Sequence, residues 1–400
     1  MTSETPSEAE DRAEGGQLRA STLELFFDLV FVFTMTQLTH SFTHHPGWAA
    51  LGQVALMFGI IWWMYSGYVW LTNEVAPDNS SRRTLLLIGM FGFFVLALAI
   101  PGAFTGSGLA FGLGYVLVNT VHTVLFAVSG GESSVRAIRA IGPINALAAG
   151  LVLAGGLIHG WPRYVLWGLA FAVQVSSPYL VDTGGFVLRV AHYCERHGLV
   201  IIVALGESVV ALGAGLSGRE ITVGLTAMVA LGLTLVYVLW WAYFGLDDEH
   251  GEHALEALPG PARVRPGLLA YGYSIYVLLV GIVMTAAGIS MTIAHGNESA
   301  STAAALALSG GVALYFLGQF GFRLSLRLAR ARLKLIAALA VLATAPIGMV
   351  WVAWGQLAIL IVVAYAFVIA DDIITIRAGE GGRYTSRSRY AARMNRRPAG

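Results

Sequence analysis

Residues 84–104 read TLLLIGMFGFFVLALAIPGAF and contain no charged side chain. A helix rises about 1.5 Å per residue, so a run of this length can cross the roughly 30 Å hydrocarbon core of a bilayer. The whole chain of 400 residues has a matching composition, with 56% hydrophobic residues, 12% charged residues and a mean hydropathy of +0.70. Soluble domains carry about 25% charged residues. The sequence therefore predicts an integral membrane protein.

Apolar stretches of membrane-spanning length recur along the chain and are separated by short polar segments. They fall at 21–41, 48–72, 84–104, 109–129, 142–160, 163–182, 197–217, 222–245, 267–294, 301–323, 333–353 and 355–376. Only helices and closed barrels satisfy their backbone groups inside lipid, and stretches this long suit helices. We therefore expect an all-α integral membrane protein with about twelve transmembrane helices.

The basic residues alternate regularly between these stretches. Lys and Arg close to helix ends are retained on the cytoplasmic side of a membrane. If the N-terminus is cytoplasmic, all of the 24 basic residues except Arg163 and Arg219 fall in segments on that side. An even number of spans places the C-terminus there as well. The sequence predicts a multi-pass protein of the cell (inner) membrane with both termini cytoplasmic.

An aromatic motif recurs in the two halves of the chain. The pattern W-W-x-Y-x-G occupies 62–67 and again 240–245. An acid precedes each motif by a similar distance, Asp28 in the first half and Glu207 in the second. Many transporters are built from duplicated bundles, and an even number of helices gives both copies the same orientation. We therefore predict two parallel six-helix pseudo-repeats.

The boundaries of the predicted units follow from this pattern. Residues 1–18 hold acids among small and polar residues, which is typical of a disordered tail. The remaining units are a first repeat over 19–182, a cytoplasmic linker over 183–196, a second repeat over 197–376 and a basic cytoplasmic tail over 377–400. Arginines in such a tail attract anionic headgroups, so membrane lipid is an expected partner.

Acids inside the apolar segments form the candidate site. Glu24 and Asp28 lie four positions apart and so share one face of a helix, and Glu207 lies at a similar depth in the second half. An ionised acid at mid-membrane costs about 2.5 to 3.5 kcal/mol on insertion scales, so such residues face a protein interior or a water-filled cavity. We expect Asp28 and Glu207 to face each other and bind a proton or cation. Glu24 is expected to change the proton or cation affinity of Asp28. The alternative is that each acid pairs with an arginine and only fixes the packing.

Further residues are expected to support this site. Arg19, Glu195 and Arg196 supply boundary charges, and Glu195 and Arg196 are expected to form a local ion pair. Acids at helix ends and the repeated aromatic residues are expected to frame a cytoplasmic mouth. These residues are Asp182, Asp371, Asp372, Trp62, Trp63, Tyr65, Trp240, Trp241 and Tyr243. The acidic segment that follows, 247–253, is expected to be a solvated loop.

Several functional classes lack their sequence signals. A net charge of +1 gives no field that would attract nucleic acid. The single cysteine, Cys194, excludes an internal disulfide, and the sequence contains neither a Walker loop nor a hydrolase nucleophile motif. We expect no enzyme activity, no cofactor and no metal. The remaining expected partner is an unidentified small solute or ion, and assembly into a homo-oligomer is left open.

Two motifs resemble the bacterial low temperature requirement protein A family. The first is ELFFDLVFVF at 24–33, preceded by Arg19, and the second comprises ERHGL at 195–199 and ALGESVV at 204–210. The resemblance extends from about residue 19 to residue 376 and implies a multi-pass bacterial inner-membrane protein, named for a cold-growth phenotype. It marks as important Glu24, Asp28, Glu195, Arg196 and Glu207. It implies no substrate.

A weaker similarity concerns the first helix. FFDLVF at 26–31 is similar to the F-S-D-G-V-F opening helix of a potassium-channel family that is also built from six-helix units, although Phe27 replaces the serine. The second half has no F-x-D motif. We expect a proton-coupled secondary transporter of an unidentified solute. The alternatives are a cation or proton channel and a non-transporting membrane scaffold or stress-adaptation factor.

Overall fold

The computed structural model describes residues 21–74, 79–129, 132–180, 188–216, 218 and 220–379. Within these ranges the chain is helical and has no strand. The helices are α2 Thr22–His44, α3 Trp48–Glu74, α4 Ser80–Ala99, α5 Gly108–Ser129, α6 Glu132–Leu157, α7 Trp161–Leu180, α8 Val190–Leu216, α9 Val223–Phe244, α10 Asp247–Glu256, α11 Val264–Gly267, α12 Ile275–Ala294, α13 Thr302–Ser325, α14 Ala331–Leu342, α15 Ala345–Val350 and α16 Ala353–Arg377. Shorter turns are η1 Ile100–Gly102, η2 Gly260–Arg263 and the π-helical η3 Leu268–Ser274.

Eleven helical segments among the described residues are long and apolar enough to cross a membrane. This confirms the predicted all-helical, polytopic architecture. The predicted span at 163–182 forms α7, which is not one of the eleven. Its polar residues Arg163, Gln174 and Ser177 lower its mean hydropathy, and all three are buried in the bundle. The part of the chain that the structure describes therefore combines eleven candidate membrane-spanning segments with one more polar long helix.

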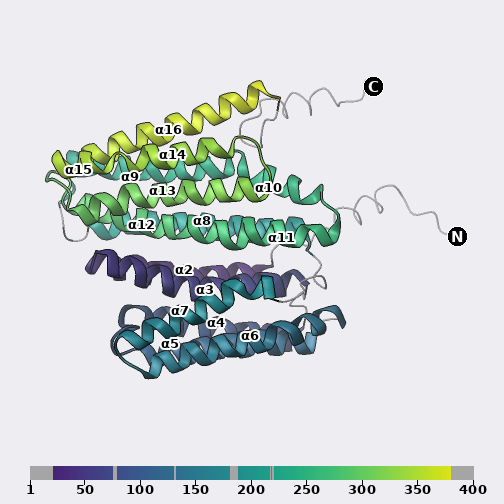
Figure 1. Ribbon diagram of the computed structural model, residues 1–400. Helices are drawn as coiled ribbons and strands as arrows, with labels where there is room; N and C mark the ends of the chain where they lie inside the picture. The colour runs from purple at the N-terminus through teal and green to yellow at the C-terminus, as the bar shows by residue number, and fades with distance from the viewer. Residues whose placement is uncertain are drawn as a thin grey trace, which may run out of the picture.

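The long helices lie side by side in two groups, α2 to α7 and α8 to α16 (Figure 1). Helix α8 begins at Val190, within the range predicted as a linker, 183–196. The two copies of W-W-x-Y-x-G also occupy different positions: Trp62 lies in the middle of α3, whereas Trp240 lies close to the end of α9. The equivalence of the two groups stays a prediction.

Hydrogen bonds from aromatic side chains join the two groups. The indole nitrogen of Trp62 in α3 donates to the backbone oxygen of Gly272 in η3 at 2.7 Å. The hydroxyls of Tyr273 and Tyr276 donate in the opposite direction, from the second group to backbone oxygens of α7 and α3. Helix α2 packs against both α8 and α12. The contact of α2 and α3 with α8, η3 and α12 therefore forms the centre of the molecule.

Small residues bring α12 and α13 into backbone contact. A Cβ atom on Gly288 would lie 2.5 Å from the backbone nitrogen of Leu308, and one on Gly311 would lie 2.5 Å from that of Thr285. Gly281 and Gly318 are equally close to the facing helix. Membrane helices associate through such close approach, because lipid supplies no hydrophobic driving force between them. The α12–α13 pair is therefore a rigid part of the second group.

Arg163, one of the two exceptions to the charge pattern, has a structural role. Its buried guanidinium donates from Nε to the backbone oxygens of Gly155 and Ile158 at 3.0 and 2.9 Å, and from Nη1 to that of Ala103 at 2.7 Å. The last carbonyl groups of a helix have no partner within it. Arg163 therefore caps the end of α6. The other exception, Arg219, lies outside the described residues, as do 1–20 and 380–400.

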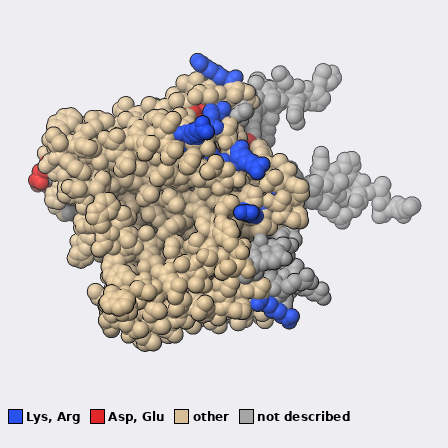
Figure 2. Space-filling model, viewed as in Figure 1, with Lys and Arg blue, Asp and Glu red and all other residues tan. Residues whose placement is uncertain are grey.

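On the face shown in Figure 2, Lys and Arg gather toward the end of the bundle at which α2 begins and α16 ends. This is the end that the charge pattern assigns to the cytoplasm. The sidedness of the bundle stays a prediction.

Candidate ion-coupling site

A buried ion pair joins the first helix to the second group. Nη2 of Arg196 in α8 donates to Oδ1 of Asp28 in α2 at 2.7 Å. Both side chains are 1% exposed. The hydroxyl of Tyr65 in α3 donates to the same Oδ1 at 2.5 Å. Three helices from both groups therefore meet at one carboxylate oxygen.

The second oxygen of Asp28 has a different environment. Oδ2 is buried and has no hydrogen-bond partner among the described residues. Buried polar atoms without a partner are rare in folded proteins, and they point to a functional role or a bound water. Because Oδ1 already accepts two hydrogen bonds, Oδ2 is the atom of this carboxylate at which a proton can attach.

Glu24 extends the cluster by one helical turn. Its Oε2 accepts from the backbone nitrogen and the hydroxyl of Ser21, each at 2.8 Å, which forms a capping box at the start of α2. Its Oε1 lies 3.1 Å from Nε2 of His192 and 3.7 Å from Nη1 of Arg196. The cap fixes the Glu24 side chain, and therefore holds its carboxylate beside the two basic residues.

Asn73 orients the imidazole ring of His192. Oδ1 of Asn73 accepts from the backbone nitrogen of Arg189 at 3.0 Å, and Nδ2 donates to the backbone oxygen of Arg189 at 2.9 Å. This orientation presents the amide N–H group to Nδ1 of His192 at 3.4 Å. Nε2 of the same ring faces Oε1 of Glu24.

The charge cluster, defined as Glu24, Asp28, His192 and Arg196, holds two carboxylates beside one guanidinium and one imidazole. It is neutral only when one further proton is bound, either on His192 or on a carboxylate. All four side chains are buried, with at most 5% exposed. A buried charge without a partner is costly, and a single proton on a carboxylate removes this cost.

Glu207 does not lie opposite Asp28, which corrects the expected facing pair. Its Oε2 accepts from the hydroxyl of Thr36 at 2.5 Å. Thr36 lies eight positions beyond Asp28, or roughly 12 Å farther along α2. The reason is the register of α8, which brings Arg196 level with Asp28 and places Glu207, about three turns farther along α8, level with Thr36. Glu207 is 4% exposed and has no ion pair with a described residue.

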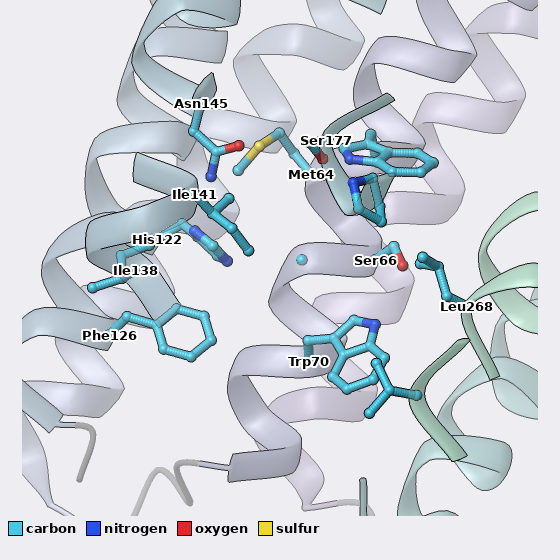
Figure 3. A pocket seen from close by; sticks show the side chains of 14 residues that line it. Met64, Ser66, Trp70, His122, Phe126, Ile138, Ile141, Asn145, Ser177 and Leu268 are labelled. Carbon is cyan, nitrogen blue, oxygen red and sulfur yellow. The ribbon is translucent and has the colours of Figure 1, made fainter. Parts of the chain in front are cut away.

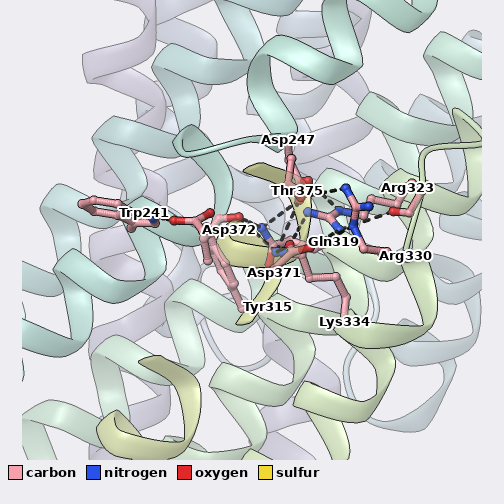
Figure 4. Close-up of polar contacts among 12 residues, drawn as sticks. Trp241, Asp247, Tyr315, Gln319, Arg323, Arg330, Lys334, Asp371, Asp372 and Thr375 are labelled. Carbon is pink, nitrogen blue, oxygen red and sulfur yellow. Dashed lines mark hydrogen bonds and ion pairs between the residues drawn. The ribbon is translucent and has the colours of Figure 1, made fainter. Parts of the chain in front are cut away.

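A second buried ion network lies within the second group (Figure 4). Arg323 of α13 donates from Nε to Oδ1 of Asp247 at 2.6 Å and from Nη2 to Oδ2 of Asp371 at 2.5 Å. Nζ of Lys334 lies 3.2 Å from Asp371 and 3.8 Å from Asp247. The segment expected to be a solvated loop therefore begins with a fully buried aspartate, because Asp247 starts α10 and pairs with two basic residues.

The aromatic residues expected at a cytoplasmic mouth are mostly core residues. Trp62, Tyr65 and Tyr243 are at most 1% exposed. Trp241 is partly buried and donates from its indole nitrogen to Oδ2 of Asp372 at 2.7 Å. Trp240 stacks on Phe244 and Tyr237 at the surface of α9, and Trp63 packs against Tyr273. The hydrogen bonds of Trp62, Tyr65 and Trp241 therefore lie within the bundle, and a shared opening framed by all of these residues stays a prediction.

A cavity of about 110 Å³ lies on the face of α3 that points away from Asp28 (Figure 3). Its walls also include α5, α6, α7, α11 and η3. The lining residues are Trp63, Met64, Ser66, Gly67, Trp70, His122, Phe126, Ile138, Ile141, Asn145, Ser177, Pro178, Val264 and Leu268. His122 is 5% exposed, and neither ring nitrogen has a hydrogen-bond partner among the described residues. The cavity is mainly apolar, and its polar lining residues are Ser66, His122, Asn145 and Ser177, of which His122 has unused ring nitrogens.

A family model described as "Bacterial low temperature requirement A protein (LtrA)" matches residues 19–369. The chain belongs to this family. It is also similar to the uncharacterized protein RA0937 of Rhizobium meliloti (strain 1021), with 29% identity over 315 residues that make up 76% of each chain. The matched range contains the whole charge cluster and Glu207, whereas Asp371 lies just beyond it.

The structure of this LtrA chain places most of the predicted site residues. Arg196 turns toward Glu24 and Asp28 rather than toward its neighbour Glu195, which is exposed on the other side of α8. Arg19 and Asp182 lie outside the described residues. The described residues contain no group of three or more His, Cys, Asp or Glu side chains able to hold a metal ion.

Sequence reasoning missed His192, Asn73, Arg323 and Lys334 as members of buried networks in this LtrA chain. In the sequence, Arg323 and Lys334 look like any other basic residue at a cytoplasmic helix end, so nothing marked them as buried. His192 offered a signal: it lies four positions before Arg196, on the same face of α8.

Proposed function

We propose that this LtrA family member is a proton-coupled secondary transporter in the inner membrane, and that the proton binds at Oδ2 of Asp28. The proton that the buried charge cluster needs in order to be neutral carries this proposal. A purely structural arrangement gains nothing from a second carboxylate beside one guanidinium, because the unpaired charge must be desolvated. A site that binds and releases a proton requires such an imbalance.

Helix α3 couples the proton site to a solute site in this proposal. Tyr65 and Trp62 face Asp28 and η3 on one side of the helix. Trp63, Gly67 and Trp70 line the cavity on the other side. Protonation of Asp28 weakens its bonds to Tyr65 and Arg196, since a neutral carboxyl group accepts less strongly. A shift of α3 then changes both sites together.

The cavity indicates the class of solute. An apolar cavity of about 150 Å³ holds benzene, so a volume of about 110 Å³ suits a compact molecule. The apolar walls favour a hydrocarbon body, and the unused nitrogens of His122 favour one hydrogen-bonding group. The proposed solute is a small neutral molecule with an apolar body and one polar group.

A proton channel is the second candidate function, and Glu207 favours it. Thr34, Thr39 and Ser208 have buried hydroxyls without a hydrogen-bond partner among the described residues, and they lie on the same two helices as Glu207 and Thr36. Such a row of polar groups suits water and a proton path. A channel conducts without solute, whereas a transporter moves protons only when solute moves.

Sidedness is part of the same proposal. We place both termini in the cytoplasm and treat the two helix groups as parallel repeats, supported by the basic residues at one end of the bundle and by α2 and α8 both starting there. The single Cys194 is 1% exposed, so cysteines introduced at Arg377 and Glu298 can be labelled selectively. A membrane-impermeant maleimide added to intact cells should label Glu298→Cys and not Arg377→Cys.

The proposed function is tested in proteoliposomes with an acidic interior and a pH-sensitive dye. Neutral alcohols, amides and ketones of compact shape are added one at a time. They carry no proton across lipid themselves, so a solute that collapses the gradient only in the presence of protein shows coupled exchange. Collapse without any solute shows a channel. If neither occurs with folded protein over the whole panel, the transport proposal is wrong and the scaffold alternative stands.

A further inference from the structure

A polar cavity of about 360 Å³ lies beside the second ion network, where α13 ends and α14 begins. Its wall contains the side chains of three arginines and two histidines. The lining residues are His250, His253, Ala254, Arg323, Arg327, Leu328, Ala329, Arg330 and Thr375. No carboxylate belongs to this lining. The cavity therefore presents hydrogen-bond donors and positive charge.

The backbone holds two of these arginines in an unusual conformation. Arg327 and Arg330 have φ values of 56° and 59°, and they are the described residues other than glycine with positive φ. The left-handed region costs roughly 1 to 2 kcal/mol for a residue with a side chain, and glycine is the usual choice at such helix ends. Backbone strain of this kind collects at functional sites. Here both strained residues are arginines, and both line the cavity.

The wall of the cavity itself carries positive charge. Arg323 and Arg330 bind the carboxylate of Asp371 behind the wall, together with Lys334. Arg327 is exposed and has no ion pair to a described residue. The lining therefore presents three arginines and no carboxylate. An anion in the cavity would relieve their mutual repulsion.

We propose that this cavity binds a phosphate-bearing anion. Arginine recognises phosphate through several charge-assisted hydrogen bonds from a planar group. The volume is many times the roughly 10 to 15 Å³ that one water needs, so a phosphate group with its waters fits. The cavity lies at the basic end of the bundle, and basic pockets between membrane helices at such depths bind lipid headgroups. The phosphate belongs either to an anionic phospholipid or to a free phosphate ion.

Native mass spectrometry of the full-length protein, released from nanodiscs of phosphatidylcholine and phosphatidylglycerol, tests the lipid source. Wild-type protein should retain phosphatidylglycerol. Arg327→Gln and Arg330→Gln should each lower the retained fraction about five-fold, the effect expected for one surface charge. Arg332→Gln is the matched control, because Arg332 is exposed on α14 and does not line the cavity.

A thermal-unfolding series in neutral detergent tests the ionic source. Inorganic phosphate should raise the melting temperature of wild-type protein and of Arg332→Gln, and it should not raise that of Arg327→Gln. If wild-type protein retains phosphatidylglycerol and inorganic phosphate does not raise its melting temperature, the bound phosphate belongs to a lipid headgroup. If inorganic phosphate raises the melting temperature, the site binds the free ion. Either result supports the site when the arginine variants lose it.

Arg327→Gly is the control for correct folding, because it removes the charge and also relieves the left-handed backbone strain. This variant should be at least as stable as wild-type protein without phosphate and should still bind phosphatidylglycerol less well. Equal retention of phosphatidylglycerol by wild-type protein and by Arg327→Gly, together with no phosphate effect, would overturn the proposal.

Discussion

Arg196 in α8 and Asp28 in α2 meet through a 2.7 Å hydrogen bond in the interior of the bundle, with both side chains 1% exposed. This contact joins the two helix groups at the point where Tyr65 also reaches Asp28. Because Glu24 shares the same guanidinium, the contact belongs to a cluster that is neutral only with one further bound proton. We expect both the stability and the proposed activity of the protein to depend on that proton.

The first prediction concerns the unequal effects of removing the two partners. Arg196→Gln leaves two buried carboxylates without their cation, and breaking a buried pair in this way costs about 3 to 5 kcal/mol. Asp28→Asn leaves Glu24 paired with Arg196 in a neutral cluster and should cost much less. Thermal unfolding in detergent should therefore give a far lower melting temperature for Arg196→Gln. Equal losses would show that the cluster is balanced in the folded protein.

The second prediction concerns Glu207, where the substitution should leave stability unchanged or raise it. Its carboxylate has no ion pair with a described residue, so Glu207→Gln removes a buried charge and retains an oxygen that can accept from Thr36. The melting temperature should stay unchanged or rise, while proton movement in proteoliposomes should fall. Thr36→Val is the companion variant, because it removes the hydroxyl and keeps the shape. A lower melting temperature for Glu207→Gln would identify Glu207 as a packing residue.

The packing of α12 against α13 is tested by two neighbouring glycines. Gly311→Ala places a Cβ atom 2.5 Å from the backbone nitrogen of Thr285, whereas the same change at Gly310 meets nothing within 4 Å. We expect Gly311→Ala to lower the melting temperature clearly. Gly310→Ala should leave it unchanged or raise it, since alanine is favoured over glycine in helices by about 1 kcal/mol. The pair serves as its own control in one unfolding experiment.

The cavity beside α3 gives a binding prediction. Cyclopentanol should bind wild-type protein more tightly than cyclopentane, because its hydroxyl can use the nitrogens of His122. His122→Phe keeps the ring volume and should weaken cyclopentanol binding roughly two- to ten-fold, the effect of one hydrogen bond. His40→Phe is the control, since His40 is exposed at the far end of α2. Saturation-transfer NMR measures both ligands, and an unchanged preference in His122→Phe would remove His122 from the site.

The sequence predicted the membrane class and the candidate acids because both are local properties. An apolar run of sufficient length predicts a span, and an acid inside such a run is costly wherever it lies. Partners are not local. Arg196 was expected to pair with Glu195 next to it, and the structure pairs it with Asp28 of a distant helix. That choice depends on the register of α8 against α2, which no periodicity encodes.

The same reason explains the error over Glu207 and Asp28. Their similar distance from a helix start suggested a common depth. Helix α8 begins seven residues earlier than the sequence indicated, at Val190 instead of 197. Glu207 therefore lies roughly two turns beyond Asp28. The acidic segment at 247–253 was misjudged because its first residue, Asp247, is neutralised by Arg323 and Lys334, which follow it far along the chain.

The central claim is that Asp28 exchanges the proton that drives solute movement. The most direct test compares wild-type protein with Asp28→Asn in acid-inside proteoliposomes, using a solute from the panel that collapses the gradient with wild-type protein. The neutral cluster of Asp28→Asn imitates the protonated state, so this variant should fold and bind the solute with wild-type affinity while the pH gradient persists. Collapse of the gradient at the wild-type rate by folded Asp28→Asn would contradict the account.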